Sequence, residues 1–141
     1  MLIQNILYTA HATAHGGRDG TVNSDEGTLS MRLAIPIALG GAGGSGTNPE
    51  QLFAAGYSAC FLSTLKHVAS ERKISLPADA QVTASVGVGP IPEGFGLAVT
   101  LSVHLPAIAR TAAQEIIEHA HRACPYSNAT RNNVDVRIEL V

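Results

Sequence analysis

The stretch that decides the fold reads NPEQLFAAGYSACFLSTLKHVASER, residues 48–72. Asn48 is a good helix N-cap, Pro49 suits the first helical position, and Glu50 favours the positive end of the helix dipole. From residue 51 to about residue 72 there is no proline. Three-and-four spacing relates Leu52, Phe53, Gly56, Ala59, Cys60, Ser63 and His67. Because a helix that is apolar most of the way round is buried, we expect a central core helix with Cys60 near its middle.

The segments before this helix alternate between strand-like and glycine-rich sequence. Residues 2–14 mix β-branched, aromatic and small side chains and predict a strand. Residues 15–20 hold three glycines in six positions and predict a loop. Residues 27–37 alternate apolar with polar side chains and predict a second strand. Residues 40–46 hold five glycines in seven positions, which favours a mobile connector over a lid above a pocket.

The segments after the helix complete an alternating strand and helix pattern. Residues 81–89 and 95–105 predict a hairpin with a longer connection at 90–94. Residues 107–123 predict an amphipathic helix that ends before Pro125, and residues 134–141 predict a last strand. The inner stripe of that helix is expected to be Ala113, Ile116, Ile117 and Ala120. The order predicts an α+β fold with mainly antiparallel sheets and a single domain over residues 1–141.

The composition excludes several classes of partner. Only 14% of the 141 residues are charged, which favours a buried subunit interface, and the net charge of −2 gives no reason to expect nucleic acid or an anionic membrane surface. No apolar run approaches the ~20 residues that a membrane span needs. The first residues lack the basic start and apolar run of a signal peptide, so we expect a cytoplasmic location.

The chain has two cysteines, Cys60 and Cys124, which lie 64 positions apart. In the cytoplasm a transient redox disulfide is more common than a lasting structural one. A cysteine in a buried helix is ordinarily an inert small hydrophobe, and burial raises the thiol pKa, so a reactive Cys60 needs a nearby cation. Arg18, on its glycine-flanked loop, is a better candidate for that cation than Lys66 or His67. A plain surface charge is the alternative interpretation of Arg18.

Cys124 precedes Pro125, which keeps its backbone out of the helical region and predicts a thiol at a turn, where it can swing. The two thiols could then be a nucleophile and its resolving partner, although sequence spacing does not establish that they meet. A zinc site with His121 competes with this interpretation, but a fourth ligand is missing and the chain has no HExxH. The absence of CxxC excludes a thioredoxin-like exchange site.

Four segments resemble one known family, the organic hydroperoxide resistance proteins (Ohr) within the Ohr/OsmC superfamily. The first signature is residues 48–61, NPEQLFAAGYSACF, and the second is residues 124–131, CPYSNATR. The family's arginine loop corresponds to residues 16–20, GGRDG, and a further shared segment to residues 91–97, IPEGFGL. The similarity spans nearly the full chain. The one visible departure is Asn132-Asn133 in place of Gly-Asn, and asparagine also tolerates a left-handed turn.

This resemblance implies a thiol peroxidase that reduces organic hydroperoxides, including fatty-acid hydroperoxides, to alcohols. It implies an intertwined OsmC-like homodimer that needs no bound cofactor or metal. The implied reductant is a dihydrolipoyl group, free as dihydrolipoamide or carried by a lipoylated protein. By position, Cys60 becomes the peroxidatic thiol and Cys124 the resolving thiol, while Arg18 and Glu50 form the polar pair that activates Cys60. A non-enzymatic redox module that binds apolar ligands is the alternative function.

Helix geometry adds one expectation to the resemblance. Glu50 and Cys60 are ten residues apart on one predicted helix, which separates them by about 15 Å along its axis and places them on different faces. We therefore expect Glu50, with Arg18, to reach Cys60 from the other subunit of a homodimer. Phe53, Phe95, Leu97 and residues 40–46 are the candidates for lining an apolar substrate pocket.

Overall fold

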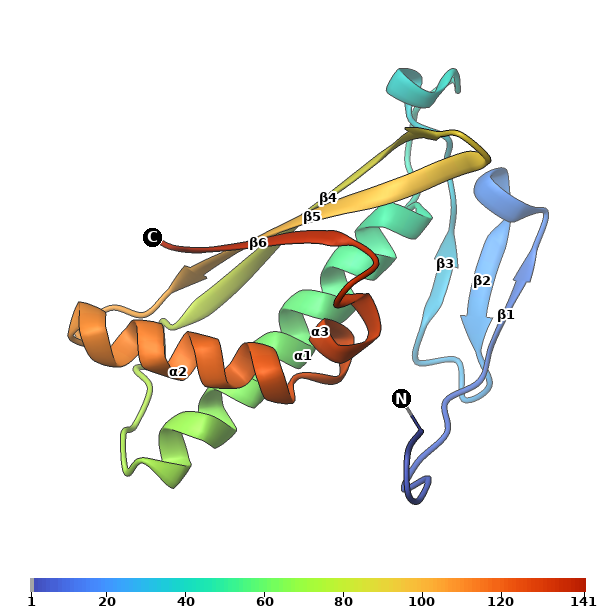
Figure 1. Ribbon diagram of the computed structural model, residues 1–141. Coiled ribbons are helices and arrows are strands. Elements are labelled where there is room, and N and C mark those ends of the chain that lie inside the picture. Colours follow the sequence, from blue (N-terminus) through green and yellow to red (C-terminus); the bar gives the residue numbers. More distant parts are fainter. Residues whose placement is uncertain (1) are drawn as a thin grey trace. The chain divides into compact units, whose positions relative to one another are not determined.

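The structure is a computed structural model that describes residues 2–141, and its helices and strands are labelled in Figure 1. The chain forms two compact units, one ending at Pro49 and one spanning Glu50–Val141. The mixture of helices with mainly antiparallel strands confirms the predicted α+β class. Among residues 2–141, no helix combines the length and the apolar character required to cross a membrane.

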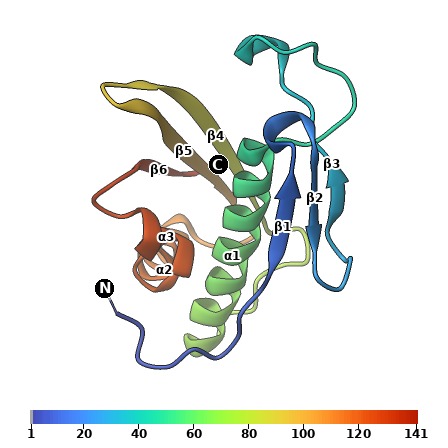
Figure 2. The same ribbon diagram turned by 90° about the vertical axis from the view of Figure 1, so that its right-hand side faces the viewer.

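The first unit contains a three-stranded antiparallel sheet in the order β1-β2-β3, which is clearest in the turned view (Figure 2). Its strands are β1 (Ala12–His15), β2 (Thr21–Ser24) and β3 (Ser30–Arg32). A short 3-10 helix, η1 (Gly17–Asp19), connects β1 to β2, and a second, η2 (Ile37–Leu39), follows β3.

Two predictions for this unit were too long, and one strand was missed. The strand predicted over residues 2–14 forms only at Ala12–His15, and that predicted over residues 27–37 forms only at Ser30–Arg32. Leu7, within the first of these segments, is 92% exposed. A strand needs a neighbouring edge to satisfy its backbone groups, and an alternating pattern does not say where such an edge is. The missed strand, β2, is short and largely polar, so it shows no clear alternation.

The loop at residues 40–46 is tied to the chain before it by backbone hydrogen bonds. The Gly43 N–H donates to the Ile35 carbonyl at 3.0 Å, and the Gly41 N–H donates to the Pro36 carbonyl at 3.1 Å. A Cβ atom at Gly41 would lie 2.2 Å from the Ile35 carbonyl oxygen, so only glycine fits there. The loop therefore folds back closely on residues 35 and 36.

The second unit is built on α1 (Pro49–Glu71), which runs without interruption and starts at the predicted proline. Its fully buried face is formed by Tyr57, Phe61, Leu65, Val68 and Ala69. The residues related by three-and-four spacing in the sequence are not the ones that form this face. Ala59, Ser63 and His67 are exposed, and Cys60 is half-buried. Because nearly every face of this helix carries apolar or small residues, its sequence did not single out the face that packs.

The second sheet has the order β4-β5-β6, with strands β4 (Gln81–Ile91), β5 (Gly94–His104) and β6 (Asp135–Leu140). β4 and β5 form the predicted hairpin, but their pairing continues to Ile91 and Gly94. The connection is thus only two residues long instead of the longer loop expected. Gly94 has a φ of 130°, which L side chains rarely adopt, and so permits the tight turn.

Two helices return the chain from β5 to β6. The amphipathic helix α2 (Arg110–Ala123) buries the four predicted residues, Ala113, Ile116, Ile117 and Ala120. A short helix that was not predicted, α3 (Pro125–Thr130), follows after Cys124 alone. Because these helices form a crossover, β6 pairs parallel to β5, with Leu101 opposite Ile138. Asn132 has a φ of 64°, so the expected left-handed turn is present.

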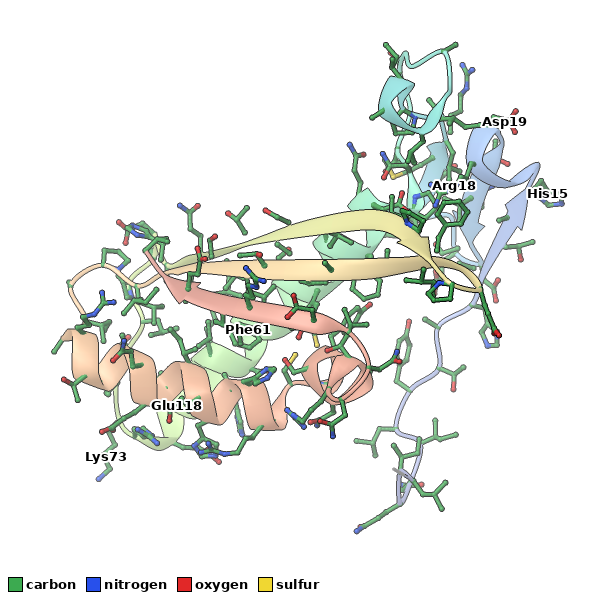
Figure 3. The ribbon with its side chains drawn as sticks, turned by 45° about the horizontal axis from the view of Figure 1, so that its top comes forward. His15, Arg18, Asp19, Phe61, Lys73 and Glu118 are labelled. Carbon is green, nitrogen blue, oxygen red and sulfur yellow. The ribbon has the colours of Figure 1, made fainter. Side chains whose placement is uncertain are left out.

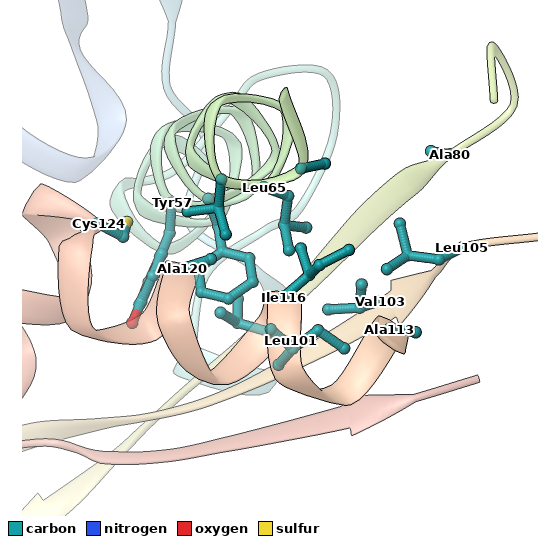
Figure 4. Packing of buried hydrophobic residues seen from close by; sticks show 14 of the residues in the cluster. Tyr57, Leu65, Ala80, Leu101, Val103, Leu105, Ala113, Ile116, Ala120 and Cys124 are labelled. Carbon is teal, nitrogen blue, oxygen red and sulfur yellow. The ribbon is translucent and has the colours of Figure 1, made fainter. Parts of the chain in front are cut away.

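One hydrophobic core joins α1, α2 and β5 in this unit. Leu65, Leu101 and Ile116 represent the three elements and are fully buried. Figure 4 shows their side chains converging between the helices and the sheet, with Cys124 at one end of the cluster. The two helices thereby cover one face of the β4-β5-β6 sheet, and the core extends to the second cysteine.

Candidate active site around Cys60 and Cys124

The structure brings the two cysteines together although they are 64 residues apart. Their Sγ atoms are 3.8 Å apart, and both thiols are free. Cys60 lies on α1 and is half-buried, whereas Cys124 is 0% exposed in the single extended residue between α2 and α3. Cys124 lies at the break between two helices that Pro125 indicated, and its side chain is buried in the core. The arrangement presents one accessible sulfur backed by one buried sulfur.

The surroundings of Cys60 within the second unit oppose its ionisation on balance. Burial is the main cause and raises the pKa of the Cys60 thiol, while the backbone N–H of Tyr126 hydrogen-bonds the sulfur and lowers the pKa. The neighbouring Cys124 raises the pKa of Cys60 again, through its charge when ionised and through the contact between the thiols. A thiolate at Cys60 therefore requires additional positive charge.

Aromatic rings surround the turn of α1 that precedes Cys60. The ring of Tyr126 packs 5.6 Å from that of Tyr57 and 6.1 Å from that of Phe53, measured between centroids. A Cβ atom at Gly56 would lie only 2.6 Å from the Tyr126 hydroxyl oxygen. Glycine at position 56 therefore leaves the space in which the Tyr126 ring lies against α1.

A buried polar network lies behind the two thiols. The Tyr57 hydroxyl is 2.8 Å from Ser127 Oγ and 3.4 Å from Thr130 Oγ1. Ser127 Oγ is in turn 2.9 Å from His121 Nδ1. Sequence reasoning missed Tyr57 and Ser127 as functional candidates, although both lie inside the two quoted signatures. Because the two hydroxyls are 70 residues apart in the sequence, no local spacing pattern indicates that they form a hydrogen bond.

Arg18 and Glu50, the other predicted site residues, are positioned by local structure. Figure 3 shows Arg18 and Asp19 in the η1 turn between β1 and β2. The turn is so tight that a Cβ atom at Gly20 would lie 1.7 Å from the His15 carbonyl oxygen, so glycine is required there. Glu50 is in the first turn of α1, the same unbroken helix that carries Cys60. Ten residues of α-helix separate Glu50 from Cys60 by about 15 Å along the axis.

The expected pocket residues do not form one group. Leu97 lines a cavity of about 360 Å³ with residues of the β4–β5 hairpin end, including Ile91 and Pro90. Phe95, at the same end, is 77% exposed, while Phe53 packs against the core. The loop at residues 41–45 lines a separate cavity of about 490 Å³ within the first unit. The His, Cys, Asp and Glu side chains of residues 2–141 form no group of three that could hold a metal ion.

Comparisons with known proteins point to one family. A family profile described as OsmC-like protein matches residues 41–139. An organic hydroperoxide resistance protein of Xanthomonas axonopodis pv. citri is 51% identical over 137 residues, which are 97% of this chain and 96% of that protein.

Two solved structures of similar proteins have the same fold. The crystal structure of the organic hydroperoxide resistance protein OhrB of Bacillus subtilis matches with a TM-score of 0.89 and 47% identity, covering 96% of this chain and 100% of the other. An organic hydroperoxide resistance protein from Legionella pneumophila matches with a TM-score of 0.91 and 50% identity, covering 96% and 98%. This chain therefore belongs to the organic hydroperoxide resistance proteins of the OsmC-like family.

Proposed function

We propose that this protein is a thiol peroxidase that reduces organic hydroperoxides, including fatty-acid hydroperoxides, to alcohols. Cys60 is the peroxidatic thiol and Cys124 the resolving thiol. The observation that carries the proposal is the 3.8 Å separation between two free sulfurs, one accessible and one fully buried. The relatives named organic hydroperoxide resistance proteins support hydroperoxides as the substrate class.

In the oxidative half of the reaction, the Cys60 thiolate attacks the terminal oxygen of the hydroperoxide. The O–O bond breaks, an S–O bond forms, and the departing alkoxide takes a proton to become the alcohol. Cys60 is then a sulfenic acid. The Cys124 thiol attacks this sulfur, forming the disulfide and releasing water. A disulfide bond is about 2 Å long, so the sulfurs need only a small further approach from 3.8 Å.

In the reductive half, a dihydrolipoyl group restores both thiols. One of its thiolates attacks the Cys60–Cys124 disulfide, and its second thiol then displaces the protein sulfur, which leaves lipoyl disulfide and two protein thiols. Cys60 is the sulfur that an incoming dithiol reaches, because Cys124 is buried. A lipoylated protein or free dihydrolipoamide is the reductant that follows from the family.

Arg18 supplies the positive charge that the half-buried Cys60 thiol needs. Its guanidinium lowers the pKa of Cys60 and donates hydrogen bonds to the peroxide oxygens. Glu50 holds Arg18 through a bidentate pair, because a carboxylate acting alone beside the thiol would oppose its ionisation. Because the helix from Pro49 to Glu71 is unbroken, Glu50 is far from Cys60 of its own chain. This supports a homodimer in which Glu50 acts on Cys60 of the other subunit.

The exposed apolar segment at the N-terminus supports the same homodimer. Leu2, Ile3, Leu7 and Tyr8 are each more than two-thirds exposed in the single chain. In an intertwined dimer, residues 2–11 could pair as a strand with the edge of a sheet in the other subunit, as their alternating pattern suggests. Each active site would then be built from two chains, with Cys60 and Cys124 from one and Arg18 and Glu50 from the other.

Mass spectrometry after one equivalent of an organic hydroperoxide tests the proposal against the non-enzymatic alternative. We expect the protein to lose two hydrogens, about 2 Da, and to yield one disulfide-linked peptide pair containing Cys60 and Cys124. A module that only binds apolar ligands would retain the ligand and keep both thiols. Retention of two free thiols at a stoichiometric dose would therefore contradict the proposal.

A further inference from the structure

The buried network behind the thiols connects three helices. Tyr57 comes from α1, His121 from the last turn of α2, and Ser127 and Thr130 from α3. Tyr57 and Ser127 are 0% exposed and Thr130 is 4% exposed. A buried hydroxyl destabilises the fold unless it is hydrogen-bonded. Three contacts of 3.4 Å or less join these side chains, so each buried hydroxyl here has a polar partner.

Every hydroxyl of the network has a hydrogen-bond partner for its proton. Thr130 donates its proton to the Tyr126 carbonyl at 2.9 Å, which leaves its oxygen as an acceptor. Burial, and after it the charge of Arg131, lowers the pKa of His121, so the ring is neutral at neutral pH. When the ring proton is on Nε2, Nδ1 accepts from Ser127 and Ser127 Oγ accepts from Tyr57; when it is on Nδ1, both bonds reverse and Tyr57 donates to Thr130 Oγ1. Every hydroxyl proton has an acceptor in either arrangement.

The network is attached to the segment that carries both groups facing Cys60. Ser127 lies three residues after Cys124, whose Sγ is 3.8 Å from the Cys60 Sγ. Tyr126 lies between them and hydrogen-bonds the Cys60 sulfur through its backbone N–H. Tyr57 is one helical turn before Cys60 on α1. The Tyr57 hydroxyl thus connects α1, which carries Cys60, to the segment that carries Cys124.

We infer that Tyr57 is a positioning residue, whose hydroxyl holds the Cys124–Ser127 segment on α1 so that the Cys124 thiol and the Tyr126 amide both face Cys60. The inference rests on the proposed pairing of Cys60 with Cys124. Phenylalanine would keep the edge contact of the ring with Phe53 and its tilted packing against Tyr126, so the hydroxyl is the part of Tyr57 to which the role is assigned. Only the hydroxyl reaches Ser127.

The test replaces Tyr57 by phenylalanine, which keeps the ring and removes the hydroxyl. Ser58→Ala is the matched control, since it removes a hydroxyl from the next residue of α1, one that donates to the Ala55 carbonyl of the same helix. Two readouts are independent of peroxide chemistry. One is the pKa of Cys60, from the pH dependence of its alkylation in a Cys124→Ser background. The other is the rate of disulfide closure by diamide, which accepts two electrons and two protons from the thiols.

We expect Tyr57→Phe to slow closure by about fivefold, the factor for the loss of one net hydrogen bond, and to raise the pKa of Cys60 as the Tyr126 N–H drifts from the sulfur. Ser58→Ala should match the wild type in both readouts. Ser127→Ala removes the other end of the same bond and should reproduce the effect, and it replaces Tyr57→Phe if that variant does not fold.

The inference is overturned if the hydroxyl-deleted protein closes its disulfide at the wild-type rate with an unchanged Cys60 pKa, whatever its melting temperature. A purely structural role would lower the melting temperature and leave both thiol readouts unchanged. Because diamide replaces the hydroperoxide, slowed closure supports the positioning role even if the protein reduces no peroxide. A wild-type protein that diamide cannot close at all would overturn the pairing itself.

Discussion

At the scale of single residues, Cys60 shows a conflict between burial and reactivity. Burial raises the pKa of its thiol, and one backbone N–H from Tyr126 opposes that effect. A thiol with a raised pKa is protonated over a wider pH range, so less thiolate is present at neutral pH and nucleophilic attack is slower. The proposed role of Arg18 is to reverse this balance.

Replacing Arg18 by alanine should therefore move the ionisation of Cys60 to higher pH. In a Cys124→Ser background, the pH midpoint for alkylation of Cys60 should rise by roughly 1–3 units, the usual effect of losing an opposite charge nearby. Arg18→Lys keeps the charge without the guanidinium fork, so its alkylation midpoint should lie between those of the wild type and Arg18→Ala. The exposed Arg32 of β3 offers a control through Arg32→Ala. An alkylation midpoint identical in Arg18→Ala and wild type would exclude the role given to Arg18.

The sequence identified some site residues and missed others for physical reasons. Cys60 and Cys124 stood out because thiols are rare here and lie within two long signatures. The contact between their sulfurs could not be derived from spacing, because it depends on how α2 and α3 pack against α1. The same reason hid the Tyr57–Ser127 hydrogen bond. Residue type and spacing indicate chemistry, whereas long-range pairing comes from the tertiary fold.

At the scale of elements, local signals predicted helices better than strands. α1 begins at Pro49 as expected, and α2 buries its four predicted residues, because caps, proline and amphipathic spacing act within a few turns. Strands depend on a partner edge elsewhere in the chain, which explains why residues 2–11 form none in the single chain. The parallel pairing of β6 with β5 was likewise not visible from the sequence.

Pro125 shows how one residue can be interpreted in two ways. It correctly marked the end of α2, since the residue before a proline avoids helical geometry, and Cys124 is extended with a ψ of 127°. Proline is also favoured at the first position of a helix, and here it begins α3. This stop and restart place Cys124 between two helices, pointing into the core. The short helix after it supplies the Tyr126 N–H that meets Cys60.

At the scale of the whole molecule, the proposal requires two chains. Glu50 and Cys60 lie about 15 Å apart along one helix axis, so the pair that activates Cys60 is assigned to the partner. The low charged fraction and the exposed apolar residues near the N-terminus are both consistent with a large subunit interface.

Mixing two inactive variants tests this composite site. In a dimer of one Cys60→Ser chain and one Glu50→Ala chain, the first chain supplies intact Arg18 and Glu50 while the second supplies both cysteines. Random pairing at equal amounts should then restore about a quarter of the wild-type sites, because half of the dimers are mixed and each has one complete site. Hydroperoxide consumption by the refolded mixture measures this recovery. Activity no higher than the average of the two separate variants would place all four residues in one chain.

The most direct test of the central claim is steady-state turnover of an organic hydroperoxide with dihydrolipoamide as the reductant. The wild type should complete many cycles, and thioredoxin in place of dihydrolipoamide should not support them. Cys124→Ser should oxidise only once per chain, because its sulfenic acid has no resolving thiol. Cys60→Ser should consume no hydroperoxide above background. Unimpaired multiple turnover in the Cys60→Ser protein would contradict the account.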